Sequence, residues 1–385
     1  MSYDAGQKLS IKMLCQFMVR KGGSDLFLSA GSQPACRIDG KIFRIGRDEL
    51  TGADCERIIT AVMDGKQRAQ YAERPEVNFS LGYPGVGRFR CNVFKQRGTM
   101  SMVIRHINTT IPTIEGLGLP EVFKDIVMAK RGLVMMVGAT GSGKSTSLAA
   151  MIDHRNRNDA GHIITIEDPI EYLHSHQKGL VTQREVGTDT LHFRDALKSS
   201  LRQNPDAILV GEIRDQEVME FALECSQTGH LCMATLHANS ANQALERALS
   251  MFPQESHDQV RGNLAVNVSA IISQRLVRAI EGHLVPAIEI LVNTPRIADL
   301  IEKWDLSSIK QAMEEGQQYG MQTFDQHLFR LCRDGVISEE EALSHADSAN
   351  NLRMKLSFAG SEEEGAESAQ QMAGRDSGNS LELAG

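Results

Sequence analysis

The sequence predicts two joined domains, a small α+β domain followed by a larger α/β domain built on a largely parallel sheet. Helical segments and hairpin signals are mixed before residue 107, which is typical of an α+β domain. Beyond residue 121, short apolar runs alternate with helical segments, which indicates parallel strands with helices on both faces. A length of 385 residues allows each domain to bury its own core.

The first domain is predicted over residues 1–107. Its expected helices cover residues 8–19, where apolar side chains share one face, and residues 51–63. Asp39-Gly40 is a hairpin signal between two short strand-like runs. The alternating stretch 89–107 predicts two further strands.

The composition changes at residues 108–120 to Thr, Pro, Gly and Ile, which predicts an interdomain linker. The second domain is expected over residues 121–355. A helix is expected over residues 145–155, and the last part of the domain is expected to be helical. The predicted buried strands are four short apolar runs at residues 133–137, 163–166, 207–210 and 231–234.

Residues 356–385 are predicted to form a disordered acidic tail. From Ala359 onward this stretch consists mainly of Gly, Ser, Ala, Glu and Gln and has no aromatic residue. Such a segment does not bury enough apolar surface to offset the entropy of ordering.

The net charge, the cysteines and the absence of long apolar runs indicate which classes of protein the sequence does not fit. The net charge is −8, which argues against a general nucleic-acid-binding protein, because such domains usually carry a basic face. The seven cysteines are scattered and form no CxxC pair, which is typical of reduced thiols in the cytoplasm. No apolar run reaches the roughly 18 residues of a membrane helix, and no signal peptide is evident. We therefore expect a cytoplasmic protein without membrane insertion.

A glycine-rich loop carries the main chemical signal. Residues 138–146 match GxxxxGK[ST] and follow an apolar run directly. Glycines let backbone N–H groups approach phosphate oxygens, and the following helix points its positive end at the anion. Lys144 is expected to reach the β- and γ-phosphates of ATP, and Ser145 to bind Mg²⁺. The alternative is an ordinary glycine-rich turn before a helix. The expected nucleotide-binding residues of the loop are Gly138, Thr140, Gly141, Ser142, Gly143, Lys144, Ser145 and Thr146.

Two acidic segments follow predicted strands and are candidates for handling metal and water. The first is the acid-rich stretch 167–171, and the second is the run that ends in Gly211-Glu212. Hydrolysis of a phosphate ester needs carboxylates at the ends of strands near the P-loop. Taken singly, either segment could be a solvated loop.

Two histidines flank the predicted strand at residues 231–234. His230 precedes it and His237 follows it closely. Their spacing is not that of a helical metal-binding pair, and a lone histidine is often a core residue. His237 lies at the strand end where a P-loop core places a γ-phosphate sensor, so sensing is favoured over metal binding.

Arginines gather on the strand-like segments before the linker. Arg88, Arg90, Arg97 and Arg105 fit an exposed alternating face. They also fit side chains that reach a nucleotide across a domain or subunit boundary, where a guanidinium stabilises transferring phosphate. We favour Arg90 and Arg105 for that second role and leave both interpretations open.

Residues 201–215, which read LRQNPDAILVGEIRD, resemble the signature of the type II/type IV secretion ATPase superfamily. The P-loop, the acid-rich stretch and the two histidines follow in that family's order. The resemblance implies a PAS-like N-terminal domain, a RecA-like P-loop ATPase domain, ATP and Mg²⁺ as cofactors, and a homohexamer. It identifies Glu171 as the catalytic glutamate, Glu212 as the metal-binding Walker B acid, and His230 and His237 as the family's histidine box, with His230 at the nucleotide.

Within the superfamily the chain is similar to the pilus retraction branch, the PilT and PilU group. It lacks the tetracysteine element of the assembly ATPases. The helical retraction motif is altered at residues 296–303, and Phe27 replaces a histidine, which favours the PilU side. This implies a motor that powers or assists type IV pilus retraction and twitching motility, with an inner-membrane platform protein and a paralogous ATPase as partners. The alternatives are a nucleotide-dependent scaffold of such a motor and an ATPase of a related secretion or conjugation machine.

Overall fold

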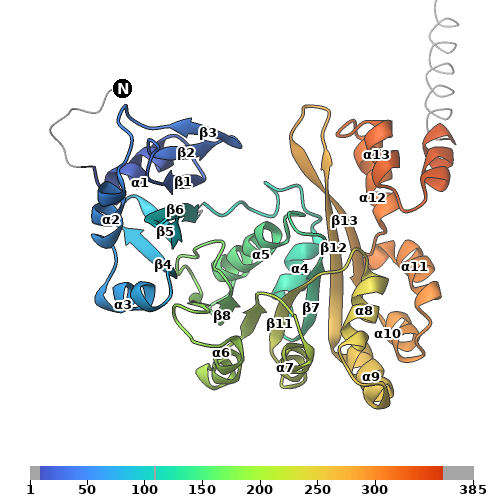
Figure 1. Ribbon diagram of the computed structural model, residues 1–385. Helices are drawn as coiled ribbons and strands as arrows, with labels where there is room; N and C mark the ends of the chain where they lie inside the picture. Colours follow the sequence, from blue (N-terminus) through green and yellow to red (C-terminus); the bar gives the residue numbers. More distant parts are fainter. Residues whose placement is uncertain (1–8, 108–109, 359–385) are drawn as a thin grey trace, which may run out of the picture. The chain divides into compact units, whose positions relative to one another are not determined.

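The computed structural model describes residues 9–107 and 110–358 (Figure 1). The chain divides into two compact units, and each is described separately below. The first unit comprises Met1–Ile111, Ile166–His176 and Val181–Ala196, and the second comprises Pro112–Thr165, Gln177–Leu180 and Leu197–Gly385. The predicted tail lies outside the described residues from 359 onward.

The first unit contains a six-stranded antiparallel sheet with the order β3-β2-β1-β6-β5-β4. Its strands are β1 (Asp25–Leu28), β2 (Ala35–Ile38), β3 (Lys41–Arg44), β4 (Glu76–Tyr83), β5 (Gly87–Gln96) and β6 (Thr99–Ile107). The predicted hairpin at Asp39-Gly40 joins β2 to β3, and residues 97 and 98 join β5 to β6. Both residues of each turn have positive φ, which explains the glycine in second place.

Three helices accompany this sheet: α1 (Ile11–Arg20), α2 (Gly52–Thr60) and α3 (Gly65–Glu73). Helix α1 packs against β1, α2 against β6, and α3 against β4. Alternate residues of β5, including Phe89 and Cys91, are fully buried in the same apolar core as Leu14 of α1. The first two helices and the two strands of residues 89–107 are confirmed, whereas α3 and β4 were not predicted.

The larger sheet has seven strands in the order β13-β12-β7-β11-β10-β8-β9. Its strands are β7 (Gly132–Val137), β8 (His162–Glu167), β9 (Leu180–Glu185), β10 (Ala207–Val210), β11 (Leu231–Leu236), β12 (Val268–Arg278) and β13 (Leu284–Val292). Strands β12, β7, β11 and β10 pair in parallel, and β13 pairs antiparallel with β12. All four predicted strands are confirmed, and every residue of β7, β10 and β11 is buried.

The helices from residue 122 onward precede, connect or follow these strands. They are α4 (Val122–Met128), α5 (Lys144–Asn158), α6 (Phe193–Ser200), α7 (Gln216–Gln227), α8 (Ala241–Ser250), α9 (His257–Asn267), α10 (Pro295–Glu302), α11 (Leu306–Glu315), α12 (Phe324–Arg333) and α13 (Glu339–His345). Helices α5 and α7 pack on β7, and α8 packs on β12. Within residues 9–107 and 110–358, no helix is both long and apolar enough to cross a membrane.

Candidate nucleotide site

The glycine-rich loop lies between the buried strand β7 and the helix α5, as its motif requires. Gly143 caps the helix in a left-handed conformation with φ of 86°, and no side chain caps the first turn. The first N–H groups of α5 therefore lack a capping side chain, and the positive end of the helix dipole is directed at the loop. This arrangement suits a phosphate group.

Gln274 of β12 supports the loop from behind. Its side-chain amide donates to the carbonyl oxygen of Ser142 at 2.8 Å and accepts a hydrogen bond from Ser147 at 2.8 Å. A Cβ at Gly138, where φ is 152°, would come within 2.5 Å of the Gln274 carbonyl oxygen. Position 138 therefore requires glycine. Gln274 is 3% exposed and was missed by the sequence analysis, because it lies 132 residues from the loop that it supports.

The loop presents a ready cation and an unsatisfied hydroxyl group. Lys144 donates to the carbonyl oxygens of Gly138 and Ala139 at 2.7 and 2.9 Å. Burial lowers the pKa of Lys144, while nearby Glu212 raises it. The Oγ of Ser142 is buried without a hydrogen-bond partner among the described residues. An open cavity of about 270 Å³ adjoins the loop. These features fit a phosphate-bearing ligand.

Glu212 lies just after β10 and is already engaged by two side chains. It accepts a hydrogen bond from Arg214 at 2.6 Å, and Nε2 of His237 lies 3.0 Å from its other oxygen. Thr235 donates to the carbonyl oxygen of Gly211 at 2.5 Å, which fixes the end of β10 against β11. The structure thus brings Glu212 and His237 together at the strand ends, and the negative charge of Glu212 acts on Lys144 of the P-loop.

His230 lies at the opposite end of β11 from His237. Its Nδ1 is 3.0 Å from the hydroxyl group of Thr228, and its carbonyl oxygen accepts from Gly132 at the start of β7. The six residues of β11 separate the two histidines by roughly 20 Å, at about 3.3 Å per residue. The structure therefore does not bring His230 to the P-loop of its own chain.

The acid-rich loop after β8 is held by a buried carboxylate. Glu185 is 5% exposed, accepts from the backbone N–H of Ile170 at 3.3 Å and accepts from Ser80 at 3.3 Å. Glu171 is the residue after Ile170 and is exposed, whereas Glu167 accepts a hydrogen bond from Gln183 at 3.3 Å. Of the two glutamates, Glu171 is therefore the one more open to solvent. The supporting role of Glu185 was not predicted.

Arg90 and Arg105 lie directly opposite each other on β5 and β6. Arg105 also lies opposite Asp25 of β1 and donates to its carboxylate at 2.9 Å. Asp25 is 4% exposed, while the side chain of Arg105 is 66% exposed. The two predicted arginines thus share one face of the sheet, and a buried aspartate anchors one of them.

No cluster of three or more His, Cys, Asp or Glu suited to holding a metal ion occurs among the described residues. A divalent ion at the P-loop would instead combine few protein ligands with oxygen atoms from a nucleotide, as Mg²⁺ commonly does. The hydroxyl group of Ser145, exposed at the start of α5, and the carboxylate of Glu212 have the oxygen chemistry that Mg²⁺ prefers.

Comparison with known proteins extends over nearly the whole chain. A family model described as "Type II/IV secretion system protein" matches residues 37–363. The type IV pilus ATPase PilU of Pseudomonas aeruginosa is 49% identical over 97% of both chains. The retraction ATPase PilT of the same organism is 44% identical over 89% of this chain and all of its own.

A solved structure shows the same fold. The crystal structure of the pilus retraction motor PilT with bound ADP superimposes with a TM-score of 0.84, at 41% identity, over 90% of this chain and 99% of that one. The predicted fold class is confirmed, an α/β ATPase with an additional N-terminal domain. The chain belongs to the type II/IV secretion system protein family, in the branch of the type IV pilus retraction ATPases.

Proposed function

We propose that this protein is an ATP-hydrolysing motor subunit that powers or assists type IV pilus retraction. The observation that carries the proposal is the phosphate cradle between β7 and α5, in which Lys144, the unsatisfied Ser142 hydroxyl group and the start of the helix converge. Relatives that are 49% and 44% identical are named as type IV pilus ATPases, which supports the motor role.

The residues of the cradle have distinct roles in this proposal. Lys144 turns from the carbonyl groups of its own loop to the β- and γ-phosphates of ATP, where its charge is better balanced. Ser145 and Glu212 hold Mg²⁺, which neutralises the charge that develops on the phosphate oxygens. The remaining contacts with the nucleotide come from backbone N–H groups and hydroxyl groups of the loop, which belong to residues 138, 140–143 and 146.

Glu171 is proposed as the general base that orients and deprotonates the attacking water. Its exposed position after β8 leaves its carboxylate accessible. His237 is proposed as the γ-phosphate sensor, since its contact with Glu212 at 3.0 Å would report a change at that carboxylate. His230 faces the other edge of the sheet, so we propose that any nucleotide it binds belongs to a neighbouring subunit.

Arg90 and Arg105 are proposed to act on a nucleotide within a ring, most simply a homohexamer. Two guanidinium groups directly opposite each other on a sheet repel, and Asp25 balances only the one that it contacts. An additional anion would stabilise the pair. Residues 108–120, as the proposed linker, would allow the two domains to move during each ATP cycle.

The proposed setting is the cytoplasmic side of the inner membrane, at a pilus platform protein and beside a paralogous ATPase, without nucleic acid. Phosphate release by the purified protein tests the enzyme directly. Retraction force in cells that carry or lack the gene tests the motor. Light scattering tests the ring, and a monomer at micromolar concentration with and without an ATP analogue would contradict it.

A second candidate is a nucleotide-dependent scaffold within a retraction motor. The altered motif coincides with α10, where Arg296 pairs with Glu315 at 2.6 Å and Lys303 pairs with Asp299 at 2.8 Å. These charges are therefore used inside the chain. Nucleotide binding without measurable phosphate release would favour the scaffold over the motor.

A further inference from the structure

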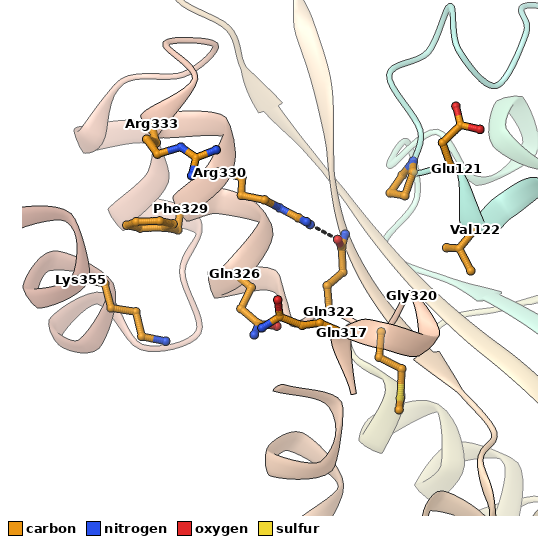
Figure 2. A pocket seen from close by; sticks show the side chains of 12 residues that line it. Glu121, Val122, Gln317, Gly320, Gln322, Gln326, Phe329, Arg330, Arg333 and Lys355 are labelled. Carbon is orange, nitrogen blue, oxygen red and sulfur yellow. Dashed lines mark hydrogen bonds between the residues drawn. The ribbon is translucent and has the colours of Figure 1, made fainter. Parts of the chain in front are cut away.

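A second polar cavity lies in the second unit, apart from the P-loop (Figure 2). Its volume is about 580 Å³, within the range of small-molecule sites. Helix α12, the 3₁₀ turn Gln317–Tyr319, the residues that open α4 and the helical stretch 349–358 contribute to its walls. The side chains that the argument uses are Glu121, Gln322, Phe329, Arg330, Arg333 and Lys355.

The cations around this cavity outnumber the carboxylates that are free to balance them. Glu121 pairs with Lys124 at 2.7 Å, and Arg333 pairs with Asp334 at 3.0 Å. Within the part of the chain that the structure describes, Arg330 and Lys355 have no carboxylate partner at ion-pair distance. Two positive charges therefore line the cavity without a direct ion pair, and the Asp334 carboxylate acts on Arg330 only from a longer distance.

Arg330 is held ready for a ligand by a neutral group. It donates to the side-chain oxygen of Gln322, as the dashed line in Figure 2 shows. The orientation of Gln322 is fixed, because its amide nitrogen donates to the carbonyl oxygen of Ile288 at 2.8 Å and the residue is 5% exposed. A guanidinium group has five N–H donors, so further donors remain for an oxyanion. Desolvation lowers the pKa of Arg330, the charge of Asp334 raises it, and the charge of Arg333 lowers it again, with a net lowering.

The other walls suit an organic anion better than a bare ion. Phe329 lies between the cationic side chains in Figure 2 and offers an apolar surface, and glutamine amides line the opposite side. Gly320, with φ of 79°, packs directly on Val122, since a Cβ there would lie 2.6 Å from that side chain. This contact joins the wall of the cavity to the start of α4, directly after the proposed linker.

We infer that this cavity binds an anion through Arg330 and Lys355, beside the C-terminal end of the proposed linker at residue 120. The ligand class is a phosphate-bearing small molecule. Carboxylates of the chain's own segment Glu362–Glu364 have related chemistry, and they follow Lys355 by seven to nine residues, a distance that an extended chain spans within roughly 30 Å. An anion here would sit where it can influence the position of the linker.

The test is calorimetric titration of inorganic pyrophosphate into the full-length protein saturated with ADP, so that the P-loop is filled. We expect Arg330→Gln and Lys355→Gln each to weaken pyrophosphate binding by about tenfold, as is typical of losing a charge-assisted hydrogen bond. Lys303→Gln is the matched control, because that cation pairs with Asp299 outside the cavity and its loss should leave the affinity unchanged.

Two further arms make the result decisive. Lys355 is exposed, so its variant should keep the wild-type melting temperature and still lose affinity. A chain that ends at Phe358 should bind pyrophosphate more tightly if the acidic segment occupies the cavity, and equally tightly if the ligand is a free phosphate compound. Equal affinity of wild type, Arg330→Gln and Lys355→Gln, or no binding by any of them, would overturn the inference.

Discussion

The P-loop and the arginine pair of the N-terminal sheet differ in what determines their geometry: the backbone in the first and side chains in the second. In the P-loop, Gly138 and Gly143 adopt positive φ and leave space that only glycine fits, so the backbone itself forms the site. In the sheet, Arg90 and Arg105 are ordinary strand residues with long side chains, and one ion pair with Asp25 orients one of them. The shape of the first site is thus set by the backbone, whereas that of the second depends on two long side chains, of which Asp25 orients one.

This difference leads to graded expectations for mutations. Loss of a preorganised group removes binding and chemistry together, because nothing else in the loop replaces it. Loss of a mobile guanidinium removes charge at the transition state and leaves nucleotide binding largely intact. The predictions below test this contrast, beginning with the largest expected effect.

Lys144→Ala should abolish hydrolysis and strongly weaken ATP binding. Lys144 is the cation of the cradle and already lies against the loop. Removing it leaves the β- and γ-phosphates without their point charge. Phosphate release and equilibrium binding of a fluorescent ATP analogue measure the two effects. Wild-type turnover by this variant would contradict the P-loop assignment.

Glu171→Gln should bind ATP normally and lose roughly 10²–10⁴-fold in turnover, the usual contribution of a general base. Glutamine keeps the shape and removes the basic oxygen. Glu167→Gln is the matched control in the same loop, because Glu167 is engaged by Gln183. If Glu167→Gln is inactive and Glu171→Gln is active, the general base is Glu167.

Arg90→Ala and Arg105→Ala should each lower turnover at least about tenfold, at the low end of what arginine fingers contribute. Nucleotide binding and ring size should barely change in either variant. The melting temperature should barely change in Arg90→Ala, whereas Arg105→Ala also removes a partner of the buried Asp25 carboxylate and should lower it. Arg37→Ala is the control, since Arg37 lies opposite Asp25 on the other side, 3.9 Å from its carboxylate. Wild-type rates in both variants would remove the nucleotide role and favour a structural face, with Arg194, Arg202 or Arg214 as the next candidates.

Gln274→Ala should weaken nucleotide binding by about five- to a hundredfold, since burying an unsatisfied partner costs about 1–3 kcal/mol. Both the Ser142 carbonyl oxygen and the Ser147 hydroxyl group would lose their partner. Gln274→Glu is the informative second variant: it preserves the acceptor for Ser147 and removes the donor to Ser142. Equal nucleotide affinity of wild type and Gln274→Ala would show that the loop holds its shape without β12.

The sequence predicted the elements that are encoded by neighbouring residues, and it missed the supporting side chains that come from distant parts of the chain. The strand, loop and helix around Lys144 follow from the one continuous stretch 132–158, and the buried strands β10 and β11 follow from their own short apolar runs. Gln274 and Glu185 support their loops from strands that are distant in sequence or polar in pattern, and no local signal identifies them. The resemblance placed His230 at the nucleotide beside His237, whereas the structure puts the two histidines at opposite ends of β11, because the ends of one strand lie at opposite edges of a sheet.

The prediction with the smallest expected effect on turnover concerns His327, a buried histidine of α12. Its protonation limits the pH range in which the P-loop and arginine variants can be compared at equal stability. Burial lowers the pKa of His327 from 6.5 to about 4, and its Nδ1 accepts from the backbone of Ile288 at 2.9 Å. Between these two values the unfolded chain binds a proton that the folded chain excludes. Stability is therefore full above about pH 6.5 and falls as the pH decreases toward 4.

The loss attributable to His327 should be about 2 kcal/mol at about pH 5, from the difference between the two pKa values. His327→Gln should lower the free energy of unfolding at neutral pH and also flatten its decrease between about pH 6.5 and 4. Exposed His283 provides the control, since His283→Gln should keep the wild-type slope. Denaturant unfolding at several pH values measures both. If the free energy of unfolding of His327→Gln decreases with pH as steeply as in the wild type, another group causes the acid sensitivity. The activities of the P-loop and arginine variants would then have to be compared at equal stability and not at equal pH.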